Sequence, residues 1–552
     1  MNAPSTGVQW LDLSKVDALT TKSLPAGSIS RSELRFAILL FLLLSLVTTA
    51  PYLLGWHLSF PDEVFSGILE HSFDVNNYLA YAAQAQSGKW LFHNPMTAEP
   101  HRAVFFNFEW LMIGKLARWL HISLPAATNL VRVLFIGLMT FAVYWYSSYF
   151  LYRVLFRRIA LVMVMLGGGF GWITAVHLLH IPLQSSYFID LTNANLFPFY
   201  WILELPHFLV SATFGVLGLC FFFQAEQHRS YRDYWAAGLF FVLAGTCRPY
   251  DMLYLMLATT LFLICDGLRK HSFKFISVRL LPNFICLPVL AYYYWIFKIH
   301  PVFRWWSLPG SPAPPPWLLI VGFGMTSVLL LTSIPKFLRR RLDDRALFLY
   351  SAAFTAIALS YLHLFLHFAF QFATNILIPL VMLVLLHWQD SICQLQRFPR
   401  WLVAFVLLLN SLTAFALTGN SWLLVSKGDF TVNADLLQAY AWLNTHSDAS
   451  EIILADYQNS NLLPQYAHNR VFCGYYNAVN FADKSKALSS FFSANSNEGS
   501  KLKLLKQNDI HFILTSGAEA QVIYGLAKHN PISEVFHSGS IQVFYATFTR
   551  DN

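Results

Sequence analysis

Carboxylate, imidazole and basic side chains gather in one long polar stretch near the N-terminus. Asp74 lies in the string FDVNNY, Glu99, His101 and Arg102 follow in AEPHR, and Lys89 lies between the two strings. A carboxylate can act as general base on an acceptor hydroxyl, or hold a divalent cation against a phosphate. A guanidinium or ammonium group can hold the phosphate itself. We therefore predict Asp74 as the catalytic base and the other four residues as substrate-binding.

Three further polar residues lie at the ends of apolar segments. Arg248 and Asp251 interrupt one apolar stretch in the string RPYD, and Gln371 precedes another. Polar groups at such depths are normally paired or functional, because they are costly against lipid. Arg248 could bind a phosphate or form a structural ion pair with Asp251, and we predict all three as substrate-binding.

Asp62 and Glu63 are the second choice for the catalytic base, and they form a reserve pair. Both they and Asp74, the first choice, could instead have a purely structural role. Asp62 and Glu63 follow a proline and precede VFSGIL, an arrangement that also fits the first turn of an interfacial helix. Asp74 could likewise be an N-cap or Asx turn that opens the helix containing Tyr78 and Tyr81. Asp62 and Glu63 are therefore predicted catalytic residues only if Asp74 is not the base.

The chain that positions these residues is largely apolar. Hydrophobic residues make up 56% of its 552 residues and charged residues only 12%. A soluble protein of this size would not have such a composition, so we predict a polytopic α-helical membrane protein. Eleven apolar segments reach spanning length, at 36–54, 127–148, 158–178, 199–224, 234–248, 251–266, 278–297, 317–335, 346–366, 372–388 and 401–419.

The charges in the loops predict the orientation. Lys and Arg are concentrated in alternate loops, beginning with the N-terminal tail, and the other loops hold few, which is the positive-inside pattern. This distribution, rather than one basic face, also excludes a nucleic-acid partner despite the net charge of +8. The six cysteines are scattered and predict neither disulfides nor a zinc site.

The alternation divides the chain into a cytoplasmic tail (1–35), a transmembrane domain (36–420) with a long outer loop (55–126), and an exported domain (421–552). The alternation holds only if 105–121 does not span, so we predict that this segment is a helix in the membrane interface. The exported part contains the short apolar strings EIILAD, RVFCG, HFILT and IQVFYATF between helical segments. These strings predict strands of a small soluble α/β domain.

A run of four glycines lies inside an apolar segment. Gly167, Gly168, Gly169 and Gly171 resemble a nucleotide-binding loop only superficially, because no Lys followed by Ser or Thr accompanies them. We predict instead that the glycines allow close packing of neighbouring helices.

The order of these elements resembles the GT-C superfamily of glycosyltransferases that use polyprenyl-phosphate sugars. In the bacterial branch that includes the aminoarabinose and lipopolysaccharide transferases, the first outer loop carries Asp-Glu-x-x-Tyr and then Gly-Asp-Trp-Leu. The matching elements are Asp74-Val-Asn-Asn-Tyr78 and Gly88-Lys-Trp-Leu91. Val75 replaces the glutamate of the family, so only the carboxylate of Asp74 is carried over. The strings AEPHRAVFFN, LPHF and RPYD are also similar to a set of bacterial GT-C-like membrane proteins.

The resemblance implies a GT-C-type hexosyl- or pentosyltransferase in the bacterial inner membrane, with its C-terminal domain in the periplasm. The donor would be a polyprenyl-phosphate-linked sugar and the acceptor a lipid or a glycan. Asp74 would deprotonate the acceptor, while Arg248, Arg102 or Lys89 neutralises the lipid phosphate. The sequence indicates no definite cofactor, and a divalent metal such as Mg or Mn could take part. The alternatives are a transporter or flippase of lipid-linked glycans, which would show midplane charges and repeats, and a non-enzymatic scaffold of the cell envelope.

Overall fold

The computed structural model separates into two compact units. It describes residues 10–11, 26–69, 72–173, 188–193, 195–204, 206–306, 313–339, 343–363, 365, 368–393 and 398–548. The helical unit comprises Met1–Pro51, Arg132–Leu290 and Gly310–Trp422, and the α/β unit comprises Tyr52–Val131, Ala291–Pro309 and Leu423–Asn552. The whole of the predicted outer loop (55–126) thus belongs to the same unit as nearly all of the predicted exported domain (421–552).

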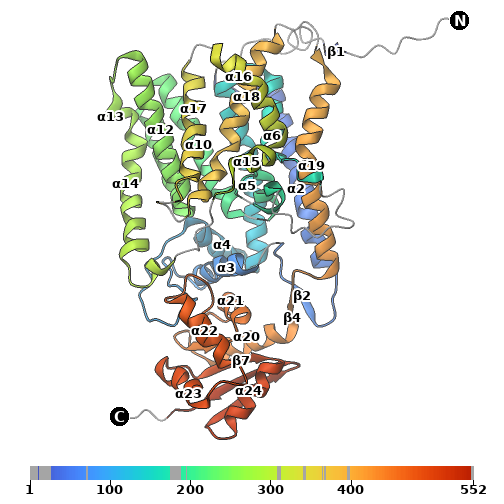
Figure 1. The fold of residues 1–552 in the computed structure, drawn as a ribbon, viewed down its shortest axis with the longest axis vertical. Helices are drawn as coiled ribbons and strands as arrows, with labels where there is room; N and C mark the ends of the chain where they lie inside the picture. Colours follow the sequence, from blue (N-terminus) through green and yellow to red (C-terminus); the bar gives the residue numbers. More distant parts are fainter. Residues whose placement is uncertain are drawn as a thin grey trace, which may run out of the picture. The chain divides into compact units, whose positions relative to one another are not determined.

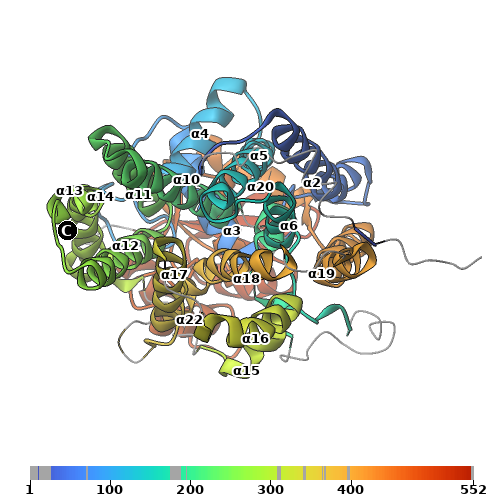
Figure 2. The ribbon, with the colours of Figure 1, turned by 90° about the horizontal axis from the view of Figure 1, so that it is seen from above.

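The helical unit is a bundle, seen end-on in Figure 2. Within it α10 packs on α11, α12 on α17, and α18 on both α6 and α16. Its helices are α2 (Arg31–His57), α5 (Leu124–Phe150), α6 (Val154–Met165), α8 (Ile189–Thr192), α9 (Pro198–Leu203), α10 (Pro206–His228), α11 (Tyr231–Cys247), α12 (Pro249–Lys270), α13 (Ile276–Arg279), α14 (Leu281–Tyr294), α15 (Pro316–Gly322), α16 (Gly324–Arg339), α17 (Asp344–Ser360), the 3-10 helix η3 (Ala369–Asn375), α18 (Leu377–Cys393) and α19 (Arg400–Lys427). Two short strands, β1 (Trp10–Leu11) and β3 (Phe398–Pro399), pair antiparallel.

The bundle contains helices that can cross a membrane. Five described helices are long and apolar enough: α2, α5, α10, α12 and most of α19. Two bent pairs raise the number to seven if each pair is one span: α15 with α16, bent by 108°, and η3 with α18, bent by 40°. The chain is therefore a polytopic membrane protein.

Each of the eleven predicted segments contains a helix, but four of these helices are shorter than a full span and are not part of a bent pair. Helix α6 has 12 residues, α14 has 14, and α11 and α17 have 17 each. About 20 apolar residues are needed to cross the hydrocarbon core. The number eleven therefore stays a prediction, whereas the presence of a helix within each segment is confirmed.

The glycine run follows the end of α6 in a turn and not inside a helix, and it allows close approach of backbone to backbone. A Cβ atom on Gly169 would lie 2.1 Å from the carbonyl oxygen of Gly322. The backbone N–H groups of Gly169 and Gly171 each donate to the Asp190 carboxylate at 2.9 Å, and Thr413 Oγ1 donates to the same oxygen at 2.8 Å. The turn around these glycines is thus occupied by a carboxylate of the protein itself.

The α/β unit is built on a five-stranded mixed sheet (Figure 1). Its strand order is β6-β5-β7-β9-β8, with β6, β5 and β7 parallel and β9 antiparallel to both β7 and β8. The strands are β5 (Ile452–Leu454), β6 (Arg470–Val471), β7 (Phe512–Ser516), β8 (Ile532–Ser538) and β9 (Ile541–Ala546). The four predicted strands are confirmed, and β8 is the one that the sequence analysis missed.

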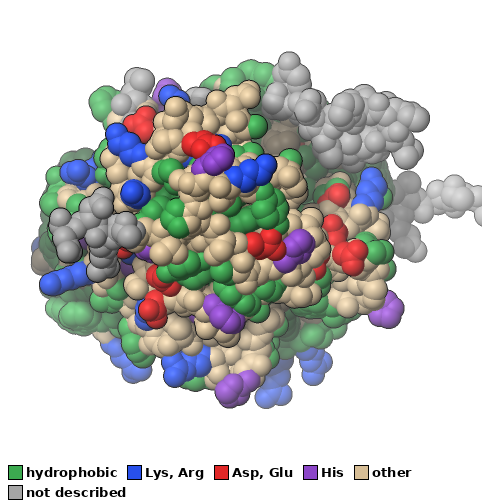
Figure 3. Space-filling view, turned by 90° about the horizontal axis from the view of Figure 1, so that it is seen from below, with side chains coloured by type: hydrophobic (Ala, Val, Ile, Leu, Met, Phe, Trp, Pro, Cys, Tyr) green, Lys and Arg blue, Asp and Glu red, His purple; other side chains and the backbone are tan. Residues whose placement is uncertain are grey.

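Helices cover both faces of this sheet. The successive residues Ile452, Ile453 and Leu454 alternate between two cores, because side chains along a strand point to opposite faces. The helices are α20 (Ala434–His446), α21 (Tyr457–Tyr466), α22 (Phe481–Phe491), α23 (Glu498–Gln507) and α24 (Ala518–Ala527). Acidic, basic and histidine side chains are interspersed on the face drawn in Figure 3, as on a domain that is exposed to water.

Residues of the first loop complete this unit. Helix α3 (Ser72–Gln86) packs on α4 (Phe108–Leu120), and a Cβ on Gly114 of α4 would lie only 2.2 Å from a carbonyl oxygen of α3. Helix α4 confirms the helix that was predicted at 105–121. Strand β2 (Glu63–Phe65) pairs with β4 (Thr431–Asn433), and the segment 291–309 adds a π-helical turn (Trp295–Ile299) and a 3-10 turn (Phe303–Trp305).

The first loop also extends the sheet at β6. The N–H of Val471 donates to the carbonyl of Pro95 at 3.0 Å, and the N–H of Gly474 donates to that of Met96 at 3.0 Å. Thr97 forms an antiparallel bridge with Cys473. Met96 and Ala98 are buried in the two cores of the sheet. The exported domain that the sequence predicted is therefore completed by the loop between α2 and α5.

Candidate active site

Asp74 lies in the first turn of α3, with its side chain exposed. A negative charge is favourable there because the N–H groups at a helix N-terminus are partly positive. Next to it, the ring of Phe73 stacks on Tyr457 at 5.4 Å between centroids. Burial, with a smaller contribution from nearby Asp74, raises the pKa of Tyr457 to about 12. The Asp74 carboxylate therefore lies near Tyr457, the first residue of α21.

Buried asparagines fix the position of this turn. Asn76 Nδ2 donates to Asn461 Oδ1 at 3.0 Å, and Asn461 Nδ2 donates to the carbonyl of Phe73 at 3.1 Å. At the next residue of α3, Asn77 Oδ1 accepts a hydrogen bond from Asn477 Nδ2 at 3.1 Å. All four amide side chains are buried. These hydrogen bonds join the first turns of α3 to the sheet domain.

A polar cavity of about 680 Å³ opens beside the same turn, within the α/β unit. Phe73 and Asn76 of α3, Glu63 of β2, and Asp456 and Glu519 of the sheet domain contribute to its wall. Burial, together with the charge of Asp456, raises the pKa of Glu519 to about 7. Carboxylate and amide groups beside an aromatic ring provide the hydrogen-bond acceptors, donors and apolar surface that a hydroxyl-rich ligand needs.

The reserve pair lies in a turn and a strand. Asp62 has a φ of 57°, in the left-handed region, and its carbonyl accepts the N–H of Ala434 at 2.9 Å. Glu63 pairs with Asn433 in the β2–β4 ladder, and its carboxylate accepts the hydroxyl of Thr431. The alternative of an interfacial helix at this position is therefore wrong, since pairing with β4 holds the backbone extended. Of the two residues, Glu63 lines the polar cavity.

The Glu99, His101 and Arg102 cluster is divided by the structure. Glu99 forms an ion pair with Lys484 at 2.6 Å. Burial alone would raise the pKa of Glu99, but hydrogen bonds from Lys484 and a nearby threonine lower it below the ordinary value. His101 Nε2 accepts the N–H of Asn94 at 2.7 Å, and its Nδ1 lies 2.8 Å from the carbonyl oxygen of Glu99. Both ring nitrogens are thus engaged, and burial lowers the pKa of His101, whereas Arg102 is exposed.

Basic groups that the sequence analysis did not select surround this loop. Arg470 donates to the carbonyl of Ala98 at 2.7 Å, and the rings of His93 and His101 lie 6.1 Å apart. Burial, followed by the charges of Lys89, His101 and Arg470, lowers the pKa of His93 to about 3. Lys89 and Arg470 therefore supply the positive charge here while the histidines are neutral. His93 lies between two predicted residues, but nothing in its sequence context indicated its burial.

Arg248, Asp251 and Gln371 form one hydrogen-bonded group within the helical unit. The guanidinium of Arg248 lies 3.1 Å from the Asp251 carboxylate and donates to Gln371 Oε1 at 2.8 Å. It also lies 3.9 Å from the ring centroid of Phe208. Asp251 further accepts the hydroxyl of Ser211 at 2.6 Å. Arg248 and Asp251 are both buried, so the charge of the guanidinium is already compensated by protein groups.

The described residues do not fit a metal centre. No group of three His, Cys, Asp or Glu side chains among them is placed to hold an ion. Divalent cations such as Mg²⁺ require several oxygen ligands at short range. We therefore derive no step through a metal.

Comparison with known proteins identifies the fold. No protein-family model matches the sequence, and a search of curated proteins finds no match. Among solved structures, ArnT from Cupriavidus metallidurans bound to undecaprenyl phosphate is 14% identical, with a TM-score of 0.52 over 92% of this chain and 97% of ArnT. The oligosaccharyltransferase of Archaeoglobus fulgidus, tethered to an acceptor peptide, is 12% identical, with a TM-score of 0.52 over 93% of this chain and 74% of its own.

A larger protein shares the same architecture. The arabinofuranosyltransferase AftD from Mycobacteria is 12% identical, with a TM-score of 0.56 over 95% of this chain and 40% of its own. All three structures are glycosyltransferases of the GT-C type. At these identities the likeness is one of fold, and it extends over nearly the whole chain. The protein is therefore a polytopic membrane protein with the GT-C fold.

Proposed function

We propose that the protein is an inverting glycosyltransferase that moves a sugar from a polyprenyl phosphate to a lipid or glycan acceptor. The observation that carries the proposal is the GT-C fold combined with the position of Asp74. The chain aligns with 97% of ArnT, which was solved with undecaprenyl phosphate. Asp74 is exposed in the first turn of α3, at the position where the aspartate of the family's first-loop motif is expected.

The proposed reaction needs one base and one cationic group. Asp74 accepts the proton of the acceptor hydroxyl as that oxygen forms a bond to the anomeric carbon of the sugar. The bond between this carbon and the phosphate oxygen breaks, and the polyprenyl phosphate leaves with its electron pair. A positioned general base contributes on the order of 10²- to 10⁴-fold to such a step. The hydrogen bonds of Asn461 with Asn76 and with the carbonyl of Phe73 hold the turn that carries this carboxylate.

The leaving phosphate is best matched to Lys89 or Arg102. Both side chains are exposed, and within the described residues neither forms an ion pair. Arg248 is a weaker choice, because its guanidinium already binds Asp251 and Gln371. A charge-assisted contact with phosphate requires a cation that is not already neutralised.

The polar cavity beside Asp74 is the proposed place for the acceptor. Its wall of amide, carboxylate and aromatic groups suits a ligand with several hydroxyls. The charges of the loops support an N-terminus in the cytoplasm, with the α/β unit in the periplasm of a bacterial inner membrane. A donor carried on a lipid also agrees with a chain whose sequence shows no nucleotide-binding motif.

The test is transfer of radiolabelled sugar from a panel of polyprenyl-phosphate donors in membranes that contain the protein. Asp74→Asn should reduce transfer by at least about 100-fold, because the amide cannot accept the proton. Asp483→Asn is the matched control, since Asp483 is also an exposed acid in the first turn of a helix of the same unit. It should transfer as the wild type does.

Two other outcomes would contradict the proposal, and a third would require a further measurement. Equal transfer by wild type and Asp74→Asn would place the base elsewhere, with Asp62 and Glu63 tested next. Equal loss in both variants would indicate a folding defect, and binding of the polyprenyl phosphate would then be compared among the three proteins. No transfer from any donor would favour a transporter of lipid-linked glycans.

A further inference from the structure

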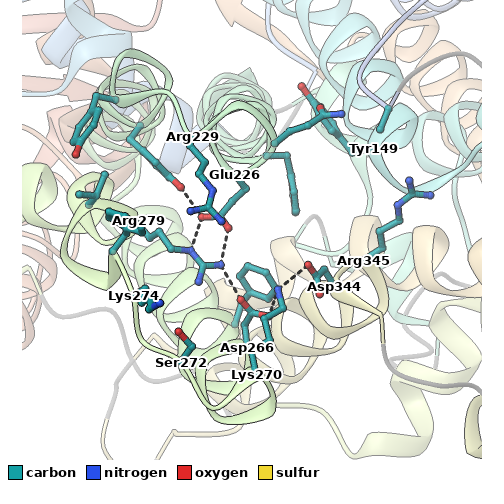
Figure 4. Close-up of a pocket in the computed structure, with 18 residues that line it drawn as sticks. Tyr149, Glu226, Arg229, Asp266, Lys270, Ser272, Lys274, Arg279, Asp344 and Arg345 are labelled. Atoms are coloured by element: carbon teal, nitrogen blue, oxygen red, sulfur yellow. Dashed lines mark hydrogen bonds and ion pairs between the residues drawn. The ribbon is translucent and has the colours of Figure 1, made fainter.

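A second cavity, which none of the predicted site residues line, lies within the helical unit (Figure 4). Its volume is about 700 Å³, and the ends of α10, α11, α12 and α17, with the loop before α13, form its wall. The loops at these ends are among those that the charge distribution assigns to the cytoplasm. The proposed glycosyl transfer uses none of its residues.

Three acidic residues of this cavity are fully committed to ion pairs. Arg279 binds Glu226 at 2.6 Å and Asp266 at 3.0 Å. Lys270 bridges Asp266 at 2.8 Å and Asp344 at 2.9 Å. In Figure 4 the dashed lines accordingly converge on these three carboxylates. The network joins α10, α12, α13 and α17 and gives the cavity a fixed polar wall.

Three further basic residues of the cavity have no acidic partner among the described residues: Arg229, Lys274 and Arg345. Figure 4 shows Lys274 and Arg345 without any dashed line. The guanidinium of Arg229 lies 5.7 Å from the ring of Phe275, which is itself 61% exposed. The cavity is lined by five basic and three acidic residues, and Arg269 outside it also pairs with Asp266 and Asp344. The net charge of the cavity is therefore positive, which attracts an anion.

The remaining wall is aromatic. Tyr149 and Phe223 stack at 5.6 Å between centroids, and Phe262 and Phe275 also line the cavity. A free phosphate ion is small and would not use such a surface. An anion attached to an acyl chain would use both parts of the wall, because basic pockets between membrane helices on the cytoplasmic side bind anionic lipid head groups.

We propose that this cavity binds the phosphate head group of an anionic phospholipid from the adjacent leaflet. Arg229, Lys274 and Arg345 contact the phosphate, and the aromatic residues pack against the upper part of the acyl chains. The carboxylates of the network hold Lys270 and Arg279 away from the ligand, so selectivity for phosphate rests on the three unpaired cations.

The test uses the full chain in a neutral detergent and native mass spectrometry of bound lipid. Dioleoylphosphatidylglycerol should bind selectively over dioleoylphosphatidylcholine. The triple variant Arg229→Gln, Lys274→Gln and Arg345→Gln should lose about a hundredfold in affinity, since each cation near a phosphate contributes roughly a factor of five. Equal binding of the two lipids, or unchanged binding by the triple variant, would overturn the proposal.

A matched control separates a site from general attraction between charges. Arg31→Gln, Arg35→Gln and Arg232→Gln remove the same charge from exposed residues of the helical unit that do not line the cavity. This variant should bind phosphatidylglycerol as the wild type does, and an equal loss would contradict a specific site. Displacement of the lipid by millimolar inorganic phosphate would show that the ligand is a free phosphate and overturn the lipid assignment.

One measurement does not depend on the folding of the variants. A photoactivatable phosphatidylglycerol with its reactive group near the glycerol should crosslink the wild-type chain in the peptide that contains Lys274 and Phe275. Crosslinks elsewhere, with none in this peptide, would overturn the proposal even if the triple variant failed to fold.

Discussion

Asn461 is the residue whose removal tests most directly how the candidate site is held in place. Its side chain is buried and makes three hydrogen bonds, accepting from Asn76 at 3.0 Å and donating to the carbonyls of Phe73 and Gly474 at 3.1 Å each. Each bond contributes about 1 kcal/mol net, so Asn461→Ala should cost about 3 kcal/mol in local stability. Asn461→Asp should be at least as harmful, because a carboxylate cannot donate to either carbonyl.

Hydrogen exchange of α3, followed by mass spectrometry, measures this loss where it occurs. A cost of about 3 kcal/mol corresponds to roughly a hundredfold faster exchange through local opening. Asn495→Ala, in an exposed loop of the same unit, is the control and should leave α3 unchanged. Exchange of α3 within about threefold of wild type in both Asn461 variants would refute the view that these amides anchor the helix that carries Asp74.

Three further predictions concern charge and packing. Burial and a neighbouring carboxylate raise the pKa of Glu519 from 4.5 to about 7. Because the unfolded chain then ionises at a lower pH than the folded one, the α/β unit should lose stability as pH rises from about 4.5 to about 7. Glu519→Gln should flatten this pH dependence of thermal unfolding. Arg248→Ala removes the cation that pairs with the buried Asp251 carboxylate, so it should destabilise the protein by about 3–5 kcal/mol. The loss should be seen as disappearance of the monodisperse peak in size-exclusion chromatography. A variant that is well folded but inactive would instead favour a role of Arg248 in phosphate binding. Gly114→Ala places a Cβ 2.2 Å from a carbonyl oxygen of α3 and should lower the free energy of unfolding by about 1–3 kcal/mol. Gly525→Ala is the control, because a Cβ there meets nothing within 4 Å. Equal melting temperatures of the two variants would contradict the close packing of α3 on α4.

The parts of the fold that local composition determines could be predicted from the sequence. Apolar segments became helices, and short apolar runs such as 511–515 became strands, because both signals lie within a few residues. Strand β8 was missed because this local apolar signal is weak in it. Its residues Ile532–Ser538 are largely exposed at the edge of the sheet, so they carry little hydrophobic pattern.

The contacts that build the site could not be predicted, because they join residues far apart in the chain. Lys484 lies 385 residues from the Glu99 that it binds, and no local pattern marks either residue as the partner of the other. Asp62 and Glu63 were given a helical alternative because β4, their pairing partner, begins only at Thr431. By contrast, the ion pair of Arg248 with Asp251 follows from a spacing of three residues and was among the alternatives drawn from the sequence.

The pairing of the first loop with β6 has a consequence for the order in which the protein is made. The hydrogen bond between Asn76 and Asn461 cannot form until Asn461 has been synthesised, 385 residues later. At 5–20 residues per second the delay is roughly 20 to 80 seconds. During this interval α3, α4 and the strand-like segment beside Met96 have no sheet to pack on. The speed of translation would then affect how much of the chain reaches its folded state.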